Sequence, residues 1–152
     1  MEDFLKFKAV DYDKRDKGRT YLFLDADGFT DRRFEIAGYF TLAIHSMPIP
    51  KGSSKTLVKK LLGGAATAEA IPVYLIGQLA KNDLFAEKIS GKMLLDKALS
   101  YIRAAQEIAA GRVVAVDCKP EPKLHEFYLR SGFKFLGHNV ENNLDQFVLK
   151  MN

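Results

Sequence analysis

The chain has 152 residues, a length that fits one domain, and 47% of them are hydrophobic, which is enough for an ordinary core. The formal net charge is +4, but Lys and Arg are interspersed with Asp and Glu, so the sequence lacks the basic stripe of a typical nucleic-acid-binding domain. A mild positive excess remains compatible with a small polyanionic ligand.

The sequence also argues against a secreted or membrane protein. Cys118 is the only cysteine, so no intramolecular disulfide can form and an oxidising compartment has no support. Residues 1–20 carry charges throughout, unlike a signal peptide, and no apolar stretch approaches the roughly 20 residues of a membrane span. We expect a cytoplasmic protein of a single domain, residues 1–152, without a membrane partner.

Hydrophobic periodicity and turn residues predict a regular series of elements. In chain order we expect a helix over 2–16, strands over 20–25 and 36–46, a short helix over 53–62, a loop over 63–70, a strand over 71–79, a polar connection over 82–90, a long helix from 91 to about 110, a strand over 112–117, a helix over 124–130, and strands over 133–136 and 146–151.

This order predicts an α/β protein with a mixed, mostly antiparallel sheet. The strand–helix–strand unit between residues 71 and 117 indicates a parallel crossover, which is right-handed in nearly all proteins. The Asp27-Gly28 turn favours an antiparallel hairpin between the first two strands, and the last two strands form a second antiparallel pair. Helices should then cover both faces of the sheet.

The polar segment before the long helix has the features of an anion-binding site. A helix N-terminus offers unpaired N–H groups and the positive end of the helix dipole, which bind phosphate without special side chains. Here Lys88 and Lys92 add charge, Ser90 adds a hydroxyl and Gly91 permits close approach. A polar loop with one glycine is also a common plain connection, so these residues alone leave both interpretations open.

Tyr128 is a candidate proton donor on the helix predicted over residues 124–130. A phenol has a reference pKa of about 10 and can protonate a leaving group at neutral pH. The same residue would also fit the edge of the core, with its ring buried and its hydroxyl near water.

Taken together, these pieces resemble the GCN5-related N-acetyltransferase (GNAT) family. Its members share an apolar fourth strand, a phosphate loop that opens a long helix, a fifth strand and a helix carrying an FY…GF motif. The matching segments here are Tyr-Leu-Ile-Gly-Gln-Leu-Ala at 74–80, Ser-Gly-Lys-Met-Leu-Leu at 90–95, Val-Val-Ala-Val-Asp at 113–117 and Phe-Tyr-Leu-Arg-Ser-Gly-Phe at 127–133. The hairpin over residues 21–46 fits the second and third strands of the family.

The resemblance implies an acetyl-coenzyme A-dependent N-acetyltransferase without a metal. The backbone at the end of the fourth family strand would pair with the pantetheine amides, the loop would hold the pyrophosphate, and Tyr128 would protonate the coenzyme A thiolate. The strand-end residues are Leu79, Ala80 and Lys81, and the loop residues are Lys88, Ile89, Ser90, Gly91 and Lys92.

The sequence departs from the family pattern in three places. The loop normally reads Gln/Arg-x-x-Gly-x-Gly/Ala, whereas Ala86–Gly91 keeps only the last glycine. Pro120-Glu121 stands where many members carry an asparagine. Many members also begin with a strand and a helix, whereas this chain begins with one predicted helix, which indicates a shortened N-terminus or an element supplied by another subunit.

No residue stands out as the base that deprotonates the attacking amine. His45, Asp83, Glu87 and His125 are candidates, but each also fits an ordinary structural or surface role, and a water relay would need no single base. Nothing marks His138.

Cys118 and the remaining polar residues do not suggest other chemistry. Cys118 fits a small buried hydrophobe better than a nucleophile. Three scattered histidines and one cysteine do not have the spacing of a metal site.

Three functions remain open. The first is acetylation of an unidentified small-molecule or macromolecular amine; the second is toxin-like acetylation of aminoacyl-tRNA, the one nucleic acid that the sequence leaves open as a partner. The third is a non-catalytic domain that binds coenzyme A or a protein. The amphipathic helix over 53–62 could act as a lid over the acceptor or form a homodimer contact.

Overall fold

The computed structural model of the chain describes residues 2–64 and 67–152. Two residues of the predicted loop 63–70, at positions 65 and 66, lie outside the described residues. The elements are α1 (Glu2–Phe7), α2 (Ala9–Lys14), β1 (Arg19–Leu24), β2 (Ile36–Pro48), α3 (Lys55–Leu61), β3 (Ala70–Lys81), the 3₁₀ helix η1 (Asp83–Phe85), α4 (Gly91–Ala109), β4 (Val113–Cys118), α5 (Pro122–Arg130), β5 (Lys134–Asn139) and β6 (Leu144–Lys150).

Six strands form a sheet in the order β1-β2-β3-β4-β6-β5. The predicted hairpin is confirmed, since β1 pairs antiparallel with β2, and β6 pairs antiparallel with both β4 and β5. The neighbouring strands β3 and β4 are joined by α4, which is the strand–helix–strand connection predicted between residues 71 and 117. The predicted α/β class with a mixed sheet is therefore confirmed.

The chain forms two compact units, each built from two separate stretches of sequence. The first unit comprises the residues up to Ala43 and Ile76–Tyr101, and the second comprises Ile44–Leu75 and Ile102–Asn152. β2, β3 and α4 each contribute residues to both units. The prediction of a single domain stays a prediction.

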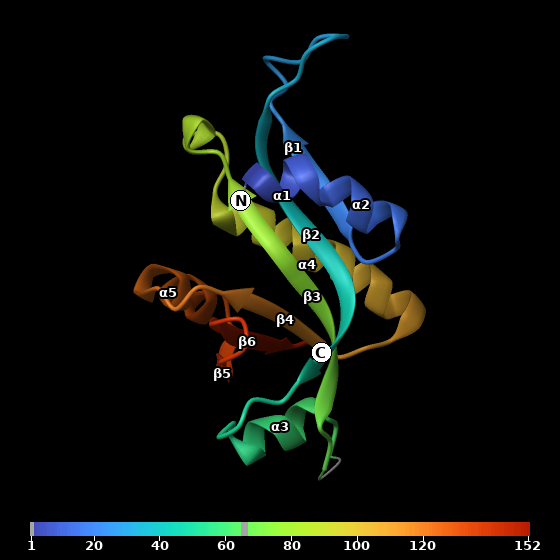
Figure 1. Cartoon of the computed structure of the whole chain (residues 1–152), viewed down its shortest axis with the longest axis vertical. Helices are drawn as coiled ribbons and strands as arrows, with labels where there is room; N and C mark the ends of the chain where they lie inside the picture. Colours follow the sequence, from blue (N-terminus) through green and yellow to red (C-terminus); the bar gives the residue numbers. More distant parts are fainter. Residues whose placement is uncertain (1, 65–66) are drawn as a thin grey trace. The chain divides into compact units, whose positions relative to one another are not determined.

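In the first unit, helices cover both faces of the sheet, and their positions along the chain can be followed in Figure 1. Tyr39 and Phe40 are neighbours on β2, so their side chains point to opposite faces. Phe4 of α1 stacks on Tyr39 with 6.3 Å between ring centroids. Tyr101 of α4 packs on Phe40 at 6.0 Å, so α1 and α4 lie on opposite faces of β2.

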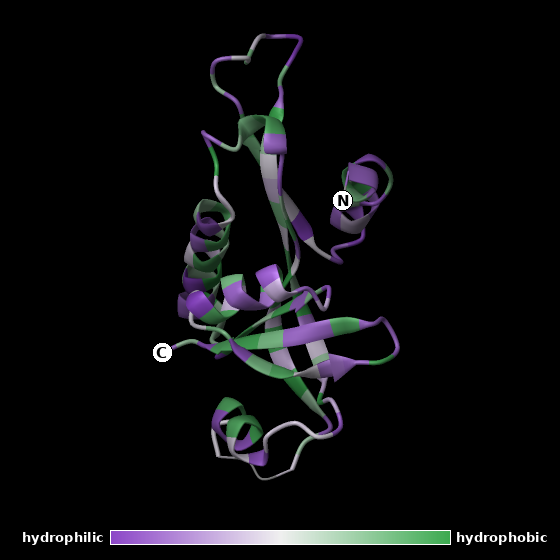
Figure 2. Cartoon of the chain, turned by 90° about the vertical axis from the view of Figure 1, so that its left-hand side faces the viewer, coloured by the Kyte–Doolittle hydropathy of each residue, from purple (hydrophilic) through white to green (hydrophobic). Residues whose placement is uncertain are grey.

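In the second unit, the apolar residues of α3 pack onto a core cluster and its lysines are exposed. Figure 2 shows hydrophilic and hydrophobic residues mixed along this helix. This arrangement matches the amphipathic pattern predicted for residues 53–62. Ser54 caps the helix by accepting a hydrogen bond from the amide of Leu57 at 3.3 Å. The buried cluster comprises Met47, Leu61, Ile71, Val73, Val113, Ala115, Leu136 and Val148, with Leu57, Val58 and Leu62 packed against it.

The N-terminal segment differs from its prediction, because the single helix expected over 2–16 is two short helices. The break is at Lys8, whose φ of −124° and ψ of −32° are not helical. Helices of this length are marginal on their own, so packing against the sheet, such as that of the buried Ala9, sets where each one ends.

Strands β2 and β3 both extend beyond their predicted ends. The amide of Asn82 donates to the carbonyl of Ala37 at 2.7 Å, and the amide of Ile49 donates to the carbonyl of Glu69 at 3.0 Å. The pairing of the two strands therefore continues through positions where the local hydrophobic pattern fades.

Among the helices of the described residues, none combines the length and the hydropathy that crossing a membrane would require.

Candidate cofactor and catalytic site

The connection between β3 and α4 contains the short helix η1, which the sequence analysis did not predict. Asn82 caps η1 by accepting a hydrogen bond from the amide of Leu84 at 3.1 Å. The carbonyl of Phe85 then accepts from the amides of Lys88 and Ile89, at 2.9 and 3.0 Å. Because Ile89 is only 4% exposed, its side chain anchors the loop to the core just before α4 begins.

Gly38 of β2 gives this loop and α4 room to approach the sheet. A Cβ at this position would come within 3.2 Å of Ile89 and of Leu94, and within 3.0 Å of the carbonyl oxygen of Ala80. The glycine therefore has a packing role that the sequence, which shows it only as an interruption of a strand, does not reveal.

The start of α4 presents an anion-binding surface. The amides of Ser90, Gly91 and Lys92 have no protein acceptor within the described part of the chain, whereas the next amide, that of Met93, donates to the hydroxyl of Ser90 at 3.2 Å. α4 has 19 residues, so the positive end of a long helix dipole reinforces these three N–H groups. Successive free amides at such an end are suited to a phosphate group.

The lysine side chains of this region are paired with carboxylates. Lys88 Nζ lies 2.9 Å from Asp25 and 2.7 Å from Asp27, both on the connection after β1. The hydrogen bonds that Lys88 donates to these carboxylates raise its pKa, and the bond to Asp27 lowers the pKa of Asp27. Lys92 pairs with Asp96 one turn further along α4, at 2.6 Å. A bound pyrophosphate would therefore compete with Asp25 and Asp27 for the ammonium group of Lys88.

The end of β3 offers backbone groups on the edge away from β2. The amide of Asn82 points toward β2, and strand alternation places the backbone groups of Ala80 on the same side. The N–H and C=O groups of Leu79 and Lys81 therefore point away from β2, as pairing with an extended ligand requires. No ion pair involves Lys81 within residues 2–64 and 67–152.

Tyr128 lies in the second unit, within an aromatic cluster formed by α5, β6 and the turn before β5. Its ring is 5.1 Å from Phe127, 5.6 Å from Phe133 and 5.9 Å from Phe147, and the residue is 6% exposed. Burial raises the pKa of Tyr128, and the electrostatic influence of the neighbouring Cys118 acts in the same direction. The phenol therefore stays protonated over the whole neutral range.

The Tyr128 hydroxyl makes no hydrogen bond with the described residues. Among the described residues, two side-chain atoms are fully buried without a hydrogen-bond partner, Thr20 Oγ1 and Gln146 Oε1. The Tyr128 oxygen also has no partner but is not one of these buried atoms, so it keeps contact with solvent. A buried ring with an accessible, unbonded hydroxyl suits a group that must donate its proton to a ligand.

Cys118 is buried at the end of β4. Burial raises the pKa of its thiol to about 11, and the carboxylates of Asp145, Asp117 and Glu121 contribute in the same direction. The nucleophilic thiolate is therefore scarce at neutral pH, in agreement with the view of Cys118 as a small buried hydrophobe.

Asp145 joins two histidines in the same unit. Its carboxylate accepts hydrogen bonds from His125 Nε2 at 2.5 Å and from His138 Nδ1 at 2.6 Å. Burial disfavours the ionised carboxylate, but the two imidazoles outweigh this and hold the pKa of Asp145 below its usual value. The sequence gives no sign of this cluster, because its members lie on α5, β5 and β6 and have no common motif.

The other base candidates show no catalytic arrangement among themselves. His45 is exposed on β2. Burial raises the pKa of Asp117, and the nearby His45 acts on that pKa in the opposite direction. Asp83 and Glu87 are exposed around η1. Among the described residues, no three His, Cys, Asp or Glu side chains are grouped so that they could hold a metal ion.

The predicted site residues are thus divided between the two units. Leu79–Lys81 and Lys88–Lys92 belong to the first unit, and Tyr128 belongs to the second. The assignment of these residues to acetyl-coenzyme A stays a prediction.

No family model and no curated protein matches the sequence, but solved structures match its fold. A tyrosine-to-phenylalanine mutant of KacT has a TM-score of 0.73 at 22% identity, covering 97% of this chain and 79% of that one. AtaT complexed with acetyl-methionyl-tRNAfMet has the same score, identity and coverage. AtaTR bound with acetyl-coenzyme A has a TM-score of 0.69 at 20% identity, covering 97% of this chain and 78% of that one.

The chain has the GNAT-type fold. The likeness extends over nearly the whole chain, beyond residues 70–140, where the sequence motifs are concentrated.

Proposed function

We propose that the protein is an acetyl-coenzyme A-dependent N-acetyltransferase. The observation that carries this proposal is the set of three unpartnered amides at the start of α4, from Ser90 to Lys92, in a fold shared with a protein solved with acetyl-coenzyme A bound. These amides would hold the pyrophosphate of the cosubstrate.

The remaining groups fit the other parts of this cosubstrate. The outward-pointing backbone of Leu79 and Lys81 would pair with the pantetheine amides. The thioester would supply an activated acetyl group. The neutral acceptor nitrogen would form a bond to the carbonyl carbon and lose a proton to water, while the carbon–sulfur bond breaks. Tyr128 would donate its phenolic proton to the departing sulfur, a role for which its raised pKa keeps it protonated.

For the acceptor, we propose the aminoacyl group of a charged tRNA. The fold of AtaT, which was solved with acetyl-methionyl-tRNAfMet, supports this choice over an unrelated small amine. The α-amino group of an aminoacyl ester has a lower pKa than a lysine side chain, so it loses its proton more readily and depends less on a strong protein base. This agrees with the lack of a clear base among the residues described above.

Replacing Tyr128 with Phe tests the catalytic part of the proposal. We expect turnover, measured as thiol release with acetyl-coenzyme A and charged tRNA, to fall about 10²- to 10⁴-fold, because the general acid is lost. The affinity for acetyl-coenzyme A in calorimetry should stay within about twofold, since the hydroxyl is not proposed to hold the ground state. Tyr12→Phe, at an exposed position on α2, is the matched control.

The possible outcomes separate the alternatives. Wild-type protein that binds no acetyl-coenzyme A would refute the proposed activity. Protein that acetylates small amines but not charged tRNA would refute the acceptor alone. Binding without turnover on any amine would support the non-catalytic alternative.

A further inference from the structure

The segment around α3 is strongly basic, although the chain as a whole is only mildly so. Residues 49–75 contain four lysines and a single acidic residue, Glu69, so this stretch carries a net charge of +3 out of the +4 of the whole chain. We call Lys51, Lys55, Lys59 and Lys60 the α3 lysines.

Of the 19 lysines and arginines outside this set, six form ion pairs with carboxylates among the described residues. Surface pairs at distances of 2.6–2.8 Å occur on α1, α2, α4 and α5, namely Lys6–Glu2, Arg15–Asp11, Lys92–Asp96 and Arg130–Glu126. Within the described residues, no ion pair involves an α3 lysine. Their charges are therefore available to an external anion.

The stability of α3 explains only part of this arrangement, since the helix dipole favours Lys59 and Lys60 in the last turn. Lys55 and Lys59 are four residues apart and lie on the same side of the helix, where like charges are destabilising. Lys55 also stands in the first turn, which has no acidic residue and where the helix dipole disfavours a cation. A bound polyanion would remove both penalties.

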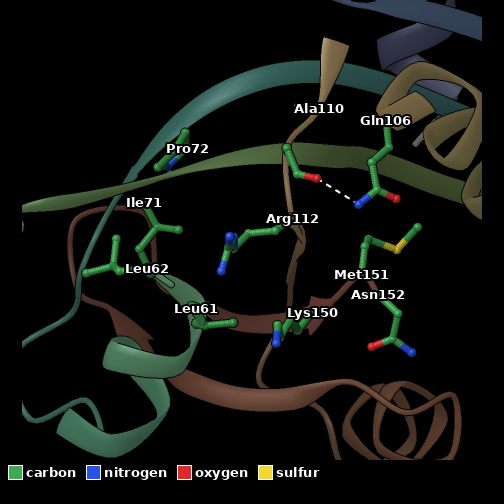
Figure 3. Close-up of a pocket in the computed structure, with 11 residues that line it drawn as sticks. Leu61, Leu62, Ile71, Pro72, Gln106, Ala110, Arg112, Lys150, Met151 and Asn152 are labelled. Carbon is green, nitrogen blue, oxygen red and sulfur yellow. Dashed lines mark hydrogen bonds between the residues drawn. The ribbon is translucent and has the colours of Figure 1, made fainter. Parts of the chain in front are cut away.

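Two cavities and two further cations border the helix. A hollow of about 800 Å³ is lined by Lys55 and Lys59 together with the turn at Pro50–Ser53 and by Glu69. At the other end of α3, a second cavity of about 630 Å³ contains the side chains of Arg112 and Lys150 beside Leu61 and Leu62, as Figure 3 shows.

Arg112 lies directly against the end of α3. A Cβ on Gly63 would come within 2.4 Å of its guanidinium, and Gly63 has a positive φ of 71°. No ion pair of Arg112 or Lys150 occurs in the part of the chain that the structure describes, so both extend the basic surface.

The surface lacks the apolar groups that a protein partner would need. The apolar residues of α3 are packed on the core cluster, and no large hydrophobic residue is exposed within the described part of residues 49–75. Protein interfaces combine an apolar centre with a polar rim, whereas a phosphate backbone requires only positive charge. The observations therefore favour a nucleic acid over an acidic peptide.

We propose that the α3 lysines, extended by Arg112 and Lys150, bind the phosphate backbone of tRNA, away from the aminoacyl end that reacts. This inference rests on the proposed acceptor. It assigns to α3, which the sequence left as a lid or a dimer contact, a role in docking the body of the RNA.

Binding of uncharged tRNA tests the surface without requiring catalysis. Raising the salt from 50 to 200 mM weakens tRNA binding by a factor that grows with the number of phosphate contacts. In a variant with all four α3 lysines changed to Gln, four contacts are lost, and we expect this factor to be roughly 50- to 150-fold smaller than in the wild type. The control changes Lys8, Lys14, Lys17 and Lys134 to Gln, which alters the net charge equally, and should keep the wild-type salt dependence. Fluorescence anisotropy with labelled tRNA gives both values.

A third variant, with the α3 lysines changed to Arg, should bind tRNA like the wild type, because it keeps the charge. Equal salt dependence in the Gln variant and the control would overturn the inference, as would a loss of binding in the Arg variant. Poly-glutamate and unlabelled tRNA can also be compared as competitors of the labelled tRNA, each at the same concentration of negative charge. If poly-glutamate displaces the labelled tRNA more effectively, the surface binds an acidic protein and the inference is overturned.

Turnover distinguishes this inference from the proposed function. The Gln variant should have a raised KM for charged tRNA but unchanged turnover on a short aminoacyl oligonucleotide that lacks the tRNA body. If neither the wild type nor any variant acetylates either substrate, the proposed function is wrong. The binding measurements with uncharged tRNA still test the role of α3 in that case.

Discussion

Asp145 shows how a single side chain can join three elements. One carboxylate accepts hydrogen bonds from His125 on α5 and from His138 on β5, while Asp145 itself lies on β6. An ionised carboxylate has only acceptor sites, so the imidazoles must donate, which requires the Nε2–H form at His125 and the Nδ1–H form at His138. The cluster therefore fixes α5, the helix that carries Tyr128, to the β5–β6 pair.

Replacing Asp145 with Ala should lower the free energy of unfolding by about 2–3 kcal/mol at pH 7, because two hydrogen bonds to a buried charge are lost. The pKa of Asp145 is lower in the folded state than in the unfolded state, where it is about 4. Its contribution to the free energy of unfolding is therefore complete above the unfolded-state pKa, and it is lost as the pH falls through the folded-state pKa. Urea unfolding of wild type and variant at pH 7 and pH 3 measures the difference. A difference as large at pH 3 as at pH 7 would contradict this account.

Helix α4 is the element on which the proposed cofactor site depends. Its first turn has two separate functions, since the Ser90 hydroxyl caps the helix while the amides of Ser90, Gly91 and Lys92 remain open to a ligand. Substitutions at one position can therefore separate the stability of the helix from its affinity for an anion.

Ser90→Asp should keep the cap, and with it the stability, because Asp is as good an N-cap as Ser. It should weaken acetyl-coenzyme A binding at least about tenfold, through repulsion between the new carboxylate and the pyrophosphate. Ser90→Ala should do the reverse, lowering the unfolding free energy by about 1 kcal/mol with a smaller effect on affinity. Calorimetry measures the affinity for acetyl-coenzyme A, and urea unfolding measures the free energy of unfolding. If affinity and stability fall together in both variants, the cap and the anion site are not separate functions.

At the scale of the whole molecule, ligand binding should stabilise the fold through the phosphate loop. A ligand that binds only the native state at 100 times its Kd adds about 2.7 kcal/mol to the unfolding free energy. We expect acetyl-coenzyme A to raise the thermal midpoint accordingly. Acetyl-pantetheine, which lacks the pyrophosphate, should raise it far less at the same concentration. Equal shifts would show that the amides at the start of α4 contribute little.

The sequence alone determined the fold and the order of the strands and main helices, apart from the break at Lys8 and the short helix η1. The apolar run of β3, the glycine that begins α4 and the aromatic helix α5 are all local patterns, since periodicity and capping depend on residues within a few positions of one another. The same local patterns placed an anion site at the start of α4, and the structure keeps three free amides there.

Only the tertiary structure decided which side chains face each other. Lys88 meets Asp25 and Asp27 across 63 and 61 residues of sequence, and Asp145 meets His125 across 20. Such contacts depend on strand order and register, which local patterns do not contain. The unpaired charges of the α3 lysines depend on the tertiary structure in the same way. Composition showed a mild excess of positive charge, and the fold leaves the four α3 lysines without a carboxylate partner among the described residues.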